Sequence, residues 1–249
     1  MTTQSAQLPL LLMGPMVRRA EQSGICIQFA TSRPGNCQIT LENQQSYSEQ
    51  QSIALGKYLY LHFIIIKPVD SQFPLDTLLA YTLHINEQKI DLTPWCFEGQ
   101  TAPSFAIANK LTHILHGSCR NAHHPAKDSL VSASEWQNTQ RSNKLQGAQL
   151  LLLSGDQVYA DDVAGPMLLA IHQLIDVLGL YKEQPLELNL PADINEQLFN
   201  RHHYLPKTPW QKRSKLGVGY WLKKDEPHFS SVKAYNHLIH FEEFIALYL

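Results

Sequence analysis

The pattern of apolar residues changes near residue 103, and this change limits the folds open to the chain. Before it, apolar and polar residues alternate, as in the segment GICIQFA at positions 24–30. A period of two is typical of strands that bury one face and expose the other. Several such segments, separated by turn signals, predict an antiparallel β-sandwich over residues 1–103.

Four segments of this first region are predicted as strands: GICIQFA (24–30), CQITL (37–41), KYLYLHFIIIKP (57–68) and LLAYTLHINEQKIDL (78–92), the last with a turn near Asn86. The first two flank Pro34-Gly35, a dipeptide that favours turns. We therefore expect these two strands to pair as a hairpin. No group of residues in this region is typical of a catalytic site.

Two apolar runs beyond residue 103, LTHILHGSCR (111–120) and GAQLLLLSGD (147–156), do not alternate. Such runs suit strands that are covered on both faces, as in an α/β sheet. The polar stretch between them predicts one short helix. Apolar residues then recur at helical spacing from Met167 to Leu178, and Gly179 follows, which predicts a helix ending there. We expect residues 104–249 to form the incomplete start of an α/β domain.

The last part of the chain predicts two further helices. One lies near ADINEQLFNRHHY (192–204), and the other is the amphipathic segment SSVKAYNHLIHFEEFIALYL (230–249). Asn236-His237 resembles half of a phosphoesterase Asn-His block, but its place inside this predicted helix favours a structural role. The final helix has no glycine or asparagine stop and no basic last turn, so we expect the chain to be the front part of a longer protein.

Composition argues against several classes of function. The net charge of -2 gives no general attraction to nucleic acid or anionic membranes, and the basic stretch HHYLPKTPWQKRSK (202–215) is better explained as a solvated loop. The run LPLLLMGPM is too short to span a bilayer, and the arginines after it reverse the order of a signal peptide. The four cysteines form no CxxC pair, so we expect free thiols in a soluble, cytoplasmic protein. No P-loop, GxSxG or GxGxxG motif supports nucleotide binding or serine hydrolysis.

Polar residues at the ends of the two apolar runs are the candidates for chemistry. In open α/β sheets, ligands bind beyond the carboxyl ends of the strands, and Cys119 and Asp156 occupy these positions. A thiolate and a carboxylate together suit a metal ion, and Tyr159 could add a phenolate ligand. Simpler explanations are a small buried cysteine and an aspartate that caps a helix. For Asp161 and Asp162 the capping role is the better interpretation.

Several motifs together resemble the alkaline phosphatase D (PhoD-like) metallophosphoesterases: GPMVRRA, HGSCR followed by HHP, GDQVYADDVAGPM and NHLIHFEEFIALYL. The resemblance covers most of the chain. It implies an N-terminal immunoglobulin-like domain and hydrolysis of phosphate mono- or diesters at a cluster of iron (Fe³⁺) and calcium, or another divalent metal. It also implies that Cys119 and Tyr159 bind iron and that Asp156 bridges two metals. The adjacent His123 and His124 are either phosphate or metal contacts or, more commonly for such a pair in a loop, solvated.

The family's later ligands, an Asp-Asp-His-Glu type block and a Gly-x-His type motif, do not occur before Leu249. The sequence therefore predicts the N-terminal portion of a PhoD-like phosphoesterase, with a phosphate ester as substrate and no nucleic-acid or membrane partner. The alternative is a non-catalytic remnant or binding module that contacts a partner through its β-sandwich or an exposed sheet. An incomplete sheet exposes a strand edge, so we also expect the isolated chain to aggregate.

Overall fold

The computed structural model describes seven stretches of the chain: residues 8–69, 72–120, 125–140, 147–161, 163–183, 188–205 and 234–249. They form two compact units, Met1–Gln157 and Val158–Leu249. The structure is mixed, contains more strand than helix and includes several antiparallel sheets, which confirms the strand-rich character expected from the sequence. The domain boundary near residue 103 stays a prediction.

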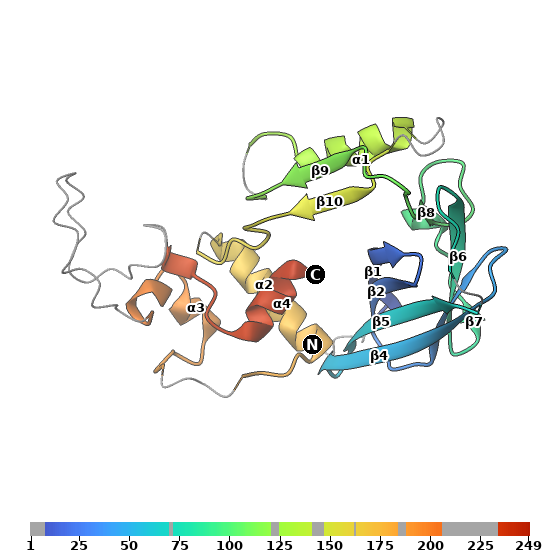
Figure 1. Cartoon of the computed structure of the whole chain (residues 1–249). Helices are drawn as coiled ribbons and strands as arrows, with labels where there is room; N and C mark the ends of the chain where they lie inside the picture. Colours follow the sequence, from blue (N-terminus) through green and yellow to red (C-terminus); the bar gives the residue numbers. More distant parts are fainter. Residues whose placement is uncertain are drawn as a thin grey trace. The chain divides into compact units, whose positions relative to one another are not determined.

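One antiparallel sheet of the first unit has the spatial order β1-β2-β5-β4 (Figure 1). Its strands are β1 (Leu11–Glu21), β2 (Gly24–Thr31), β5 (Leu59–Pro68) and β4 (Ser46–Gly56). The predicted strands at 24–30 and 57–68 are therefore confirmed, and they pair with each other in the register Ile27 to Ile64. Burial alternates along most of β5 and at the start of β2, as the period of two requires, whereas Ile27–Thr31 of β2 are buried without interruption.

A second antiparallel sheet is built around β6, which pairs with β3, β7 and β8. Its strands are β3 (Cys37–Leu41), β6 (Leu78–Ile85), β7 (Gln88–Lys89) and β8 (Ser104–Ala106). The turn predicted near Asn86 is confirmed, because β6 and β7 pair on either side of it. A short 3-10 helix, η1 (Thr93–Trp95), follows β7.

The predicted hairpin between the segments 24–30 and 37–41 is wrong. β2 pairs with β1 and β5, whereas β3 pairs with β6 in the other sheet. The link between them crosses from sheet to sheet: the Ser32 N–H donates to the Leu10 carbonyl, and Asn36 exchanges hydrogen bonds with Asn86. Alternation of apolar residues shows which face of a strand is buried. It does not show whether the next strand along the chain pairs with it in the same sheet or lies in the opposing sheet, because both arrangements bury the same face.

Buried side chains from both sheets form one core. Its members on the strands include Ile25, Ile27, Phe29, Ile64 and Ile66 from the first sheet and Cys37, Ile39, Leu41, Leu79, Tyr81, Leu83 and Ile85 from the second. β2, β3, β5 and β6 thus contribute most of a shared interior, which is the packing expected of two antiparallel sheets.

The two apolar runs beyond residue 103 form parallel neighbours, β9 (Ile114–Gly117) and β10 (Leu150–Leu153), with Leu153 opposite Gly117 (Figure 1). The short helix predicted between them is also confirmed, as α1 (Ser129–Gln140). The expectation that both faces of these strands are covered is wrong for the described residues. The four leucines of β10 are between 39% and 51% exposed. Within the described stretches this sheet has two strands, and α1 has no buried residue.

The second unit contains α2 (Gly165–Leu178), α3 (Ile194–Gln197), η3 (Arg201–His203), η5 (Ala234–Asn236) and α4 (Phe241–Tyr248). α2 matches the predicted helix and ends at Gly179, which has φ 57 in the left-handed region. Its N-cap is Ala164 and its first turn holds no acid, so the capping role expected for Asp161 is wrong. Asp162 lies outside the described residues.

The two later helices are shorter than predicted. The segment 192–204 holds α3 and then η3, and the segment 230–249 holds η5 and then α4. Asn236-His237 therefore lies before α4 and not inside a helix that spans the whole segment. The Asn236 side chain is buried, and its Oδ1 accepts a hydrogen bond of 2.8 Å from the Phe199 N–H, which supports the structural role expected for it.

No helix in the described stretches combines the length and apolar character that a membrane crossing requires. The four cysteines carry free thiols, as expected.

Candidate functional site

The carboxyl ends of β9 and β10 are held together beyond the last residues of the strands. The Ser154 N–H donates to the Gly117 carbonyl over 3.0 Å, and the Cys119 N–H donates to the Gly155 carbonyl over 2.9 Å. The parallel ladder thus continues into both loops. Since both loops leave the same edge of the sheet, the side chains that follow them meet there.

Cys119 and Asp156 are brought into contact at this edge. The Cys119 Sγ lies 3.4 Å from Asp156 Oδ2, and both residues are exposed to solvent. Cys119 has φ 58 and Asp156 has φ 44, although neither is glycine. Such conformations cost about 1–3 kcal/mol each and concentrate at functional sites, where the surrounding structure enforces them. The two predicted residues therefore converge in a strained arrangement that the hydrogen-bonded loops maintain.

The separation of the two side chains fits a shared cation. Metal–thiolate bonds are about 2.3 Å and metal–carboxylate bonds about 2.1 Å, so two ligands at tetrahedral or octahedral angles lie about 3.1–3.6 Å apart. The observed 3.4 Å between Sγ and Oδ2 falls within this range. The Cys119 sulfur, which donates a hydrogen bond to the Asp156 carboxylate, therefore stands at a spacing that one shared metal ion also allows.

The two polar residues on either side of Cys119, Ser118 and Arg120, each have a hydrogen-bond partner of their own. Ser118 Oγ lies 3.0 Å from the Cys119 Sγ, so it can donate to a thiolate there. Arg120 forms an ion pair of 2.7 Å with Asp128, whose carboxylate also accepts the Leu130 N–H in the first turn of α1. The hydrogen bond from Arg120, followed by that from Leu130, holds the pKa of Asp128 below its usual value. Arg120 is thus anchored to the start of α1.

The third predicted metal ligand, Tyr159, is half-buried and belongs to the second unit. Its part in the metal site stays a prediction. His123 and His124 lie outside the described residues.

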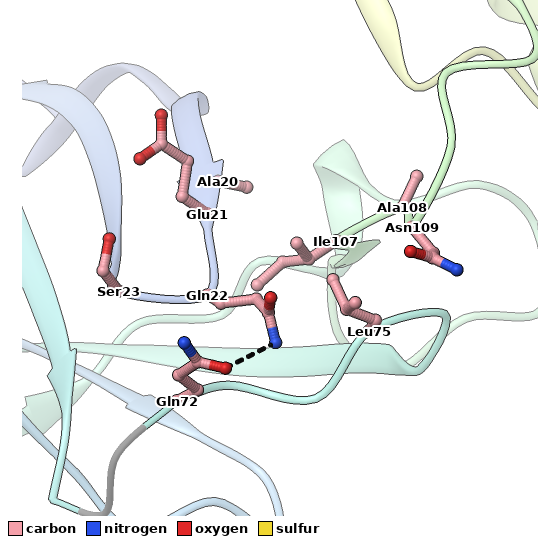
Figure 2. Close-up of a pocket in the computed structure, with 9 residues that line it drawn as sticks. All are labelled: Ala20, Glu21, Gln22, Ser23, Gln72, Leu75, Ile107, Ala108 and Asn109. Atoms are coloured by element: carbon pink, nitrogen blue, oxygen red, sulfur yellow. Dashed lines mark hydrogen bonds between the residues drawn. The ribbon is translucent and has the colours of Figure 1, made fainter.

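A pocket of about 430 Å³ in the first unit lies between the β1–β2 turn and the segments around Leu75 and Ile107 (Figure 2). A hydrogen bond of 3.1 Å joins two of its lining residues, Gln22 and Gln72 (Figure 2). Its one ionisable side chain, Glu21, is paired with Arg19 at 2.6 Å. The lining holds one hydroxyl, that of Ser23, but no histidine, lysine or second acid to activate it, and it includes none of the predicted site residues.

Sequence reasoning missed a buried charge cluster in the second unit. Glu243 and Arg201 are both 0% exposed at the side chain, and two hydrogen bonds of 2.6 and 2.9 Å join them. His172 Nε2 lies 2.7 Å from the same carboxylate, and Gln197 Oε1 accepts from Arg201 over 2.7 Å. This cluster joins α2, the segment around η3 and α4.

The environment of Glu243 favours its charged form. Burial by itself raises the pKa of this carboxyl, but hydrogen bonds from His172 and Arg201, the Arg201 charge and the Ile239 N–H outweigh burial. They hold the pKa well below its usual range. A carboxylate that is fully paired and closed to solvent cannot reach a substrate, so the cluster is structural. The helical pattern of this segment gave no signal that its two adjacent glutamates, Glu242 and Glu243, would both be buried.

Comparisons with family models, with curated proteins and with solved structures give no match for this chain.

Proposed function

We propose that the chain belongs to a PhoD-like metallophosphoesterase that hydrolyses phosphate mono- or diesters. The observation that supports this most strongly is the contact of 3.4 Å between Cys119 Sγ and Asp156 Oδ2 at the carboxyl ends of two parallel strands. The convergence of strand ends predicts that these residues meet, and their separation is compatible with two ligands of one metal ion.

Cys119 and Asp156 would hold an iron ion, with Tyr159 as a further ligand by resemblance and calcium or another divalent ion beside it. A cation at this position would supply activation of water and neutralisation of charge on a phosphoryl group. The left-handed backbone at Cys119 and Asp156 sets the direction of both donors before any ligand binds. In the described part of the chain, the Asp156 carboxylate has its one hydrogen bond with Cys119, which leaves its second oxygen for a second ion.

The same proposal assigns the architecture. The two antiparallel sheets with a shared core would be the immunoglobulin-like domain, and β9, α1 and β10 would open the catalytic α/β domain. Four free thiols fit a reducing compartment, so we place the protein in the cytoplasm. Its partner would be a phosphate ester, with no nucleic acid and no membrane.

Iron binding gives the first test. The purified chain, loaded with iron, should retain about one ion per molecule by elemental analysis, and visible absorbance would report thiolate and phenolate ligands. Cys119→Ser and Asp156→Asn should each weaken binding by at least about 100-fold, because losing a supporting residue of a metal site already costs 10- to 100-fold. Cys26→Ser on β2 and Asp176→Asn on α2 change residues of the same types outside the pair and should bind as the unmodified chain does.

Hydrolysis of bis-p-nitrophenyl phosphate gives the second test. Turnover should require the metal, stop on chelation and fall by at least about 100-fold in Asp156→Asn but not in Asp176→Asn. Undiminished turnover in Asp156→Asn would contradict the assignment. A folded chain that binds no iron and hydrolyses no ester would favour the non-catalytic binding module.

A further inference from the structure

We propose that Glu183, His240 and Glu242 form a second metal site, specific for a divalent transition-metal ion, in the second unit. One imidazole nitrogen and two carboxylate oxygens of these residues all lie within 4.8 Å of one another. The three residues take no part in the strand-end pair, and the inference does not rest on the proposed phosphoesterase activity.

Two helix ends supply the three side chains. Glu183 lies five residues after the end of α2, while His240 is the N-cap of α4 and Glu242 is in its first turn. α2 packs against α4, and the buried carboxylate of Glu243 accepts the N–H groups of Ile239 and His240 over 2.7 and 3.1 Å. The backbone that carries His240 and Glu242 is therefore fixed by a buried ion pair before a metal arrives.

The surroundings of Glu242 point to a missing cation. Glu242 is only 6% exposed. Among the described residues, its carboxylate accepts one hydrogen bond, from the Glu183 N–H over a long 3.3 Å. No lysine or arginine in the described stretches forms an ion pair with it. Buried carboxylates are normally paired with a cation or coordinate a metal. Glu242 instead faces a second carboxylate, that of Glu183.

The positive end of α4 accounts for part of this cluster. Glu183 Oε2 accepts the Phe241 N–H over 3.2 Å, so it serves the first turn of the helix. Glu242 receives no comparable bond from its own helix, although it is the more buried of the two acids. Helix capping thus explains the positions of Glu183 and of His240, which takes part in a capping box with Glu243. The buried charge of Glu242 is offset only by the dipole of α4 and the long bond from Glu183, and by no cation in the described residues.

The donor set selects the class of metal. Calcium and magnesium prefer sites made entirely of oxygen, whereas a histidine with carboxylates suits zinc and its first-row neighbours. Three protein ligands leave a fourth position of a tetrahedral ion open to water. Glu183 is exposed, so its side chain is free to move closer to His240 and Glu242 when the ion binds.

Calorimetric titration with Zn²⁺ tests the site, in a chain that also carries Cys119→Ser so that the strand-end pair cannot contribute. We expect one ion per chain, and weaker binding by at least about 10-fold in Glu183→Gln, His240→Gln and Glu242→Gln. Glu196→Gln, an exposed glutamate on α3 of the same unit, is the matched control and should bind as its parent does.

Amide hydrogen exchange separates metal binding from a loss of folding. Glu183 is exposed, so Glu183→Gln should keep the exchange pattern of the ion-free parent while Zn²⁺ no longer slows exchange at residues 239–243. Unchanged zinc affinity in both Glu183→Gln and Glu242→Gln, or protection by zinc elsewhere only, would overturn the proposal. Either outcome leaves the iron-binding test of the strand-end pair unaffected.

Discussion

The carboxylate of Glu243 holds together three segments that are distant in the sequence. It meets Arg201, His172 and two backbone N–H groups in a region closed to solvent. A buried ion pair of this kind adds little net stability compared with apolar packing, but removing one partner leaves a buried charge without compensation. The second unit is therefore sensitive to this one residue.

Glu243→Gln should lower the free energy of unfolding by about 3–5 kcal/mol, because the Arg201 guanidinium then stays buried without its counter-charge. Urea denaturation followed by circular dichroism measures the loss, and hydrogen exchange should locate it in α2 and α4. Asp176→Asn, in an exposed pair of 3.7 Å with Lys182, should change stability by less than about 0.5 kcal/mol. A loss below about 1 kcal/mol in Glu243→Gln would contradict the role of the pair.

The pH dependence of stability follows from the same carboxylate. Its pKa in the folded chain lies below the ordinary value of 4.5, so its contribution is complete above about pH 4.5 and is lost as the pH falls through the lowered folded pKa. The free energy of unfolding of the unmodified chain should therefore decline more steeply below pH 4.5 than that of Glu243→Gln. Parallel pH profiles for the two proteins would contradict this interpretation.

At the scale of elements, α2 shows how a sequence signal sets a boundary. Gly179 adopts φ 57, its N–H donates to the Asp176 carbonyl, and the Leu180 N–H reaches back to the Ile175 carbonyl over 3.0 Å. Leu180 is buried directly after this turn. The glycine thus ends the helix and directs the chain into the packed interior.

Gly179→Ala should destabilise the chain by about 1 kcal/mol, since a Cβ disfavours the left-handed conformation. Gly179→Asn should cost less, because asparagine adopts that conformation more readily. Thermal unfolding of the two variants beside the parent chain measures the order of stability. Equal stability of the alanine and glycine proteins would show that the end of α2 tolerates another conformation.

The sequence predicted where strands form but not which strands pair with each other. The period-two pattern placed β2 and β3 correctly as strands, but their pairing depends on which sheet each joins, and that choice involves Leu10, Asn86 and the strands far along the chain. The same limit applies to α4, where a helical pattern was right over Phe241–Tyr248 but the segment before it forms η5 and a loop. Local periodicity carries no information about such non-local contacts.

At the scale of the whole molecule, the exposed leucines of β10 are the feature that most favours aggregation. Leu151 is 51% exposed, and β9 and β10 are both edge strands of their sheet in the described structure. Unpaired strand edges with apolar side chains favour association with other chains.

The chain should associate in a concentration-dependent way in sedimentation velocity experiments, and Leu151→Lys should reduce this association. Val177→Lys, which places the same charge at a site 52% exposed on α2, is the control and should have a smaller effect. A monodisperse monomer at all concentrations would contradict the prediction.

The sequence by itself determined the local elements and one pair of candidate ligands. Alternation, apolar runs and helical spacing identified β2, β3, β5, β6, β9, β10 and α2 but missed β1 and β4. The shared direction of two parallel strands predicted that Cys119 and Asp156 converge. Tertiary structure alone decided the rest: the sheet that β3 joins, the exposure of β10, and the burial of Glu242 and Glu243 beside Arg201. Strand and helix periods follow from backbone geometry within a few residues, whereas burial of a charge depends on which distant side chain arrives to pair with it.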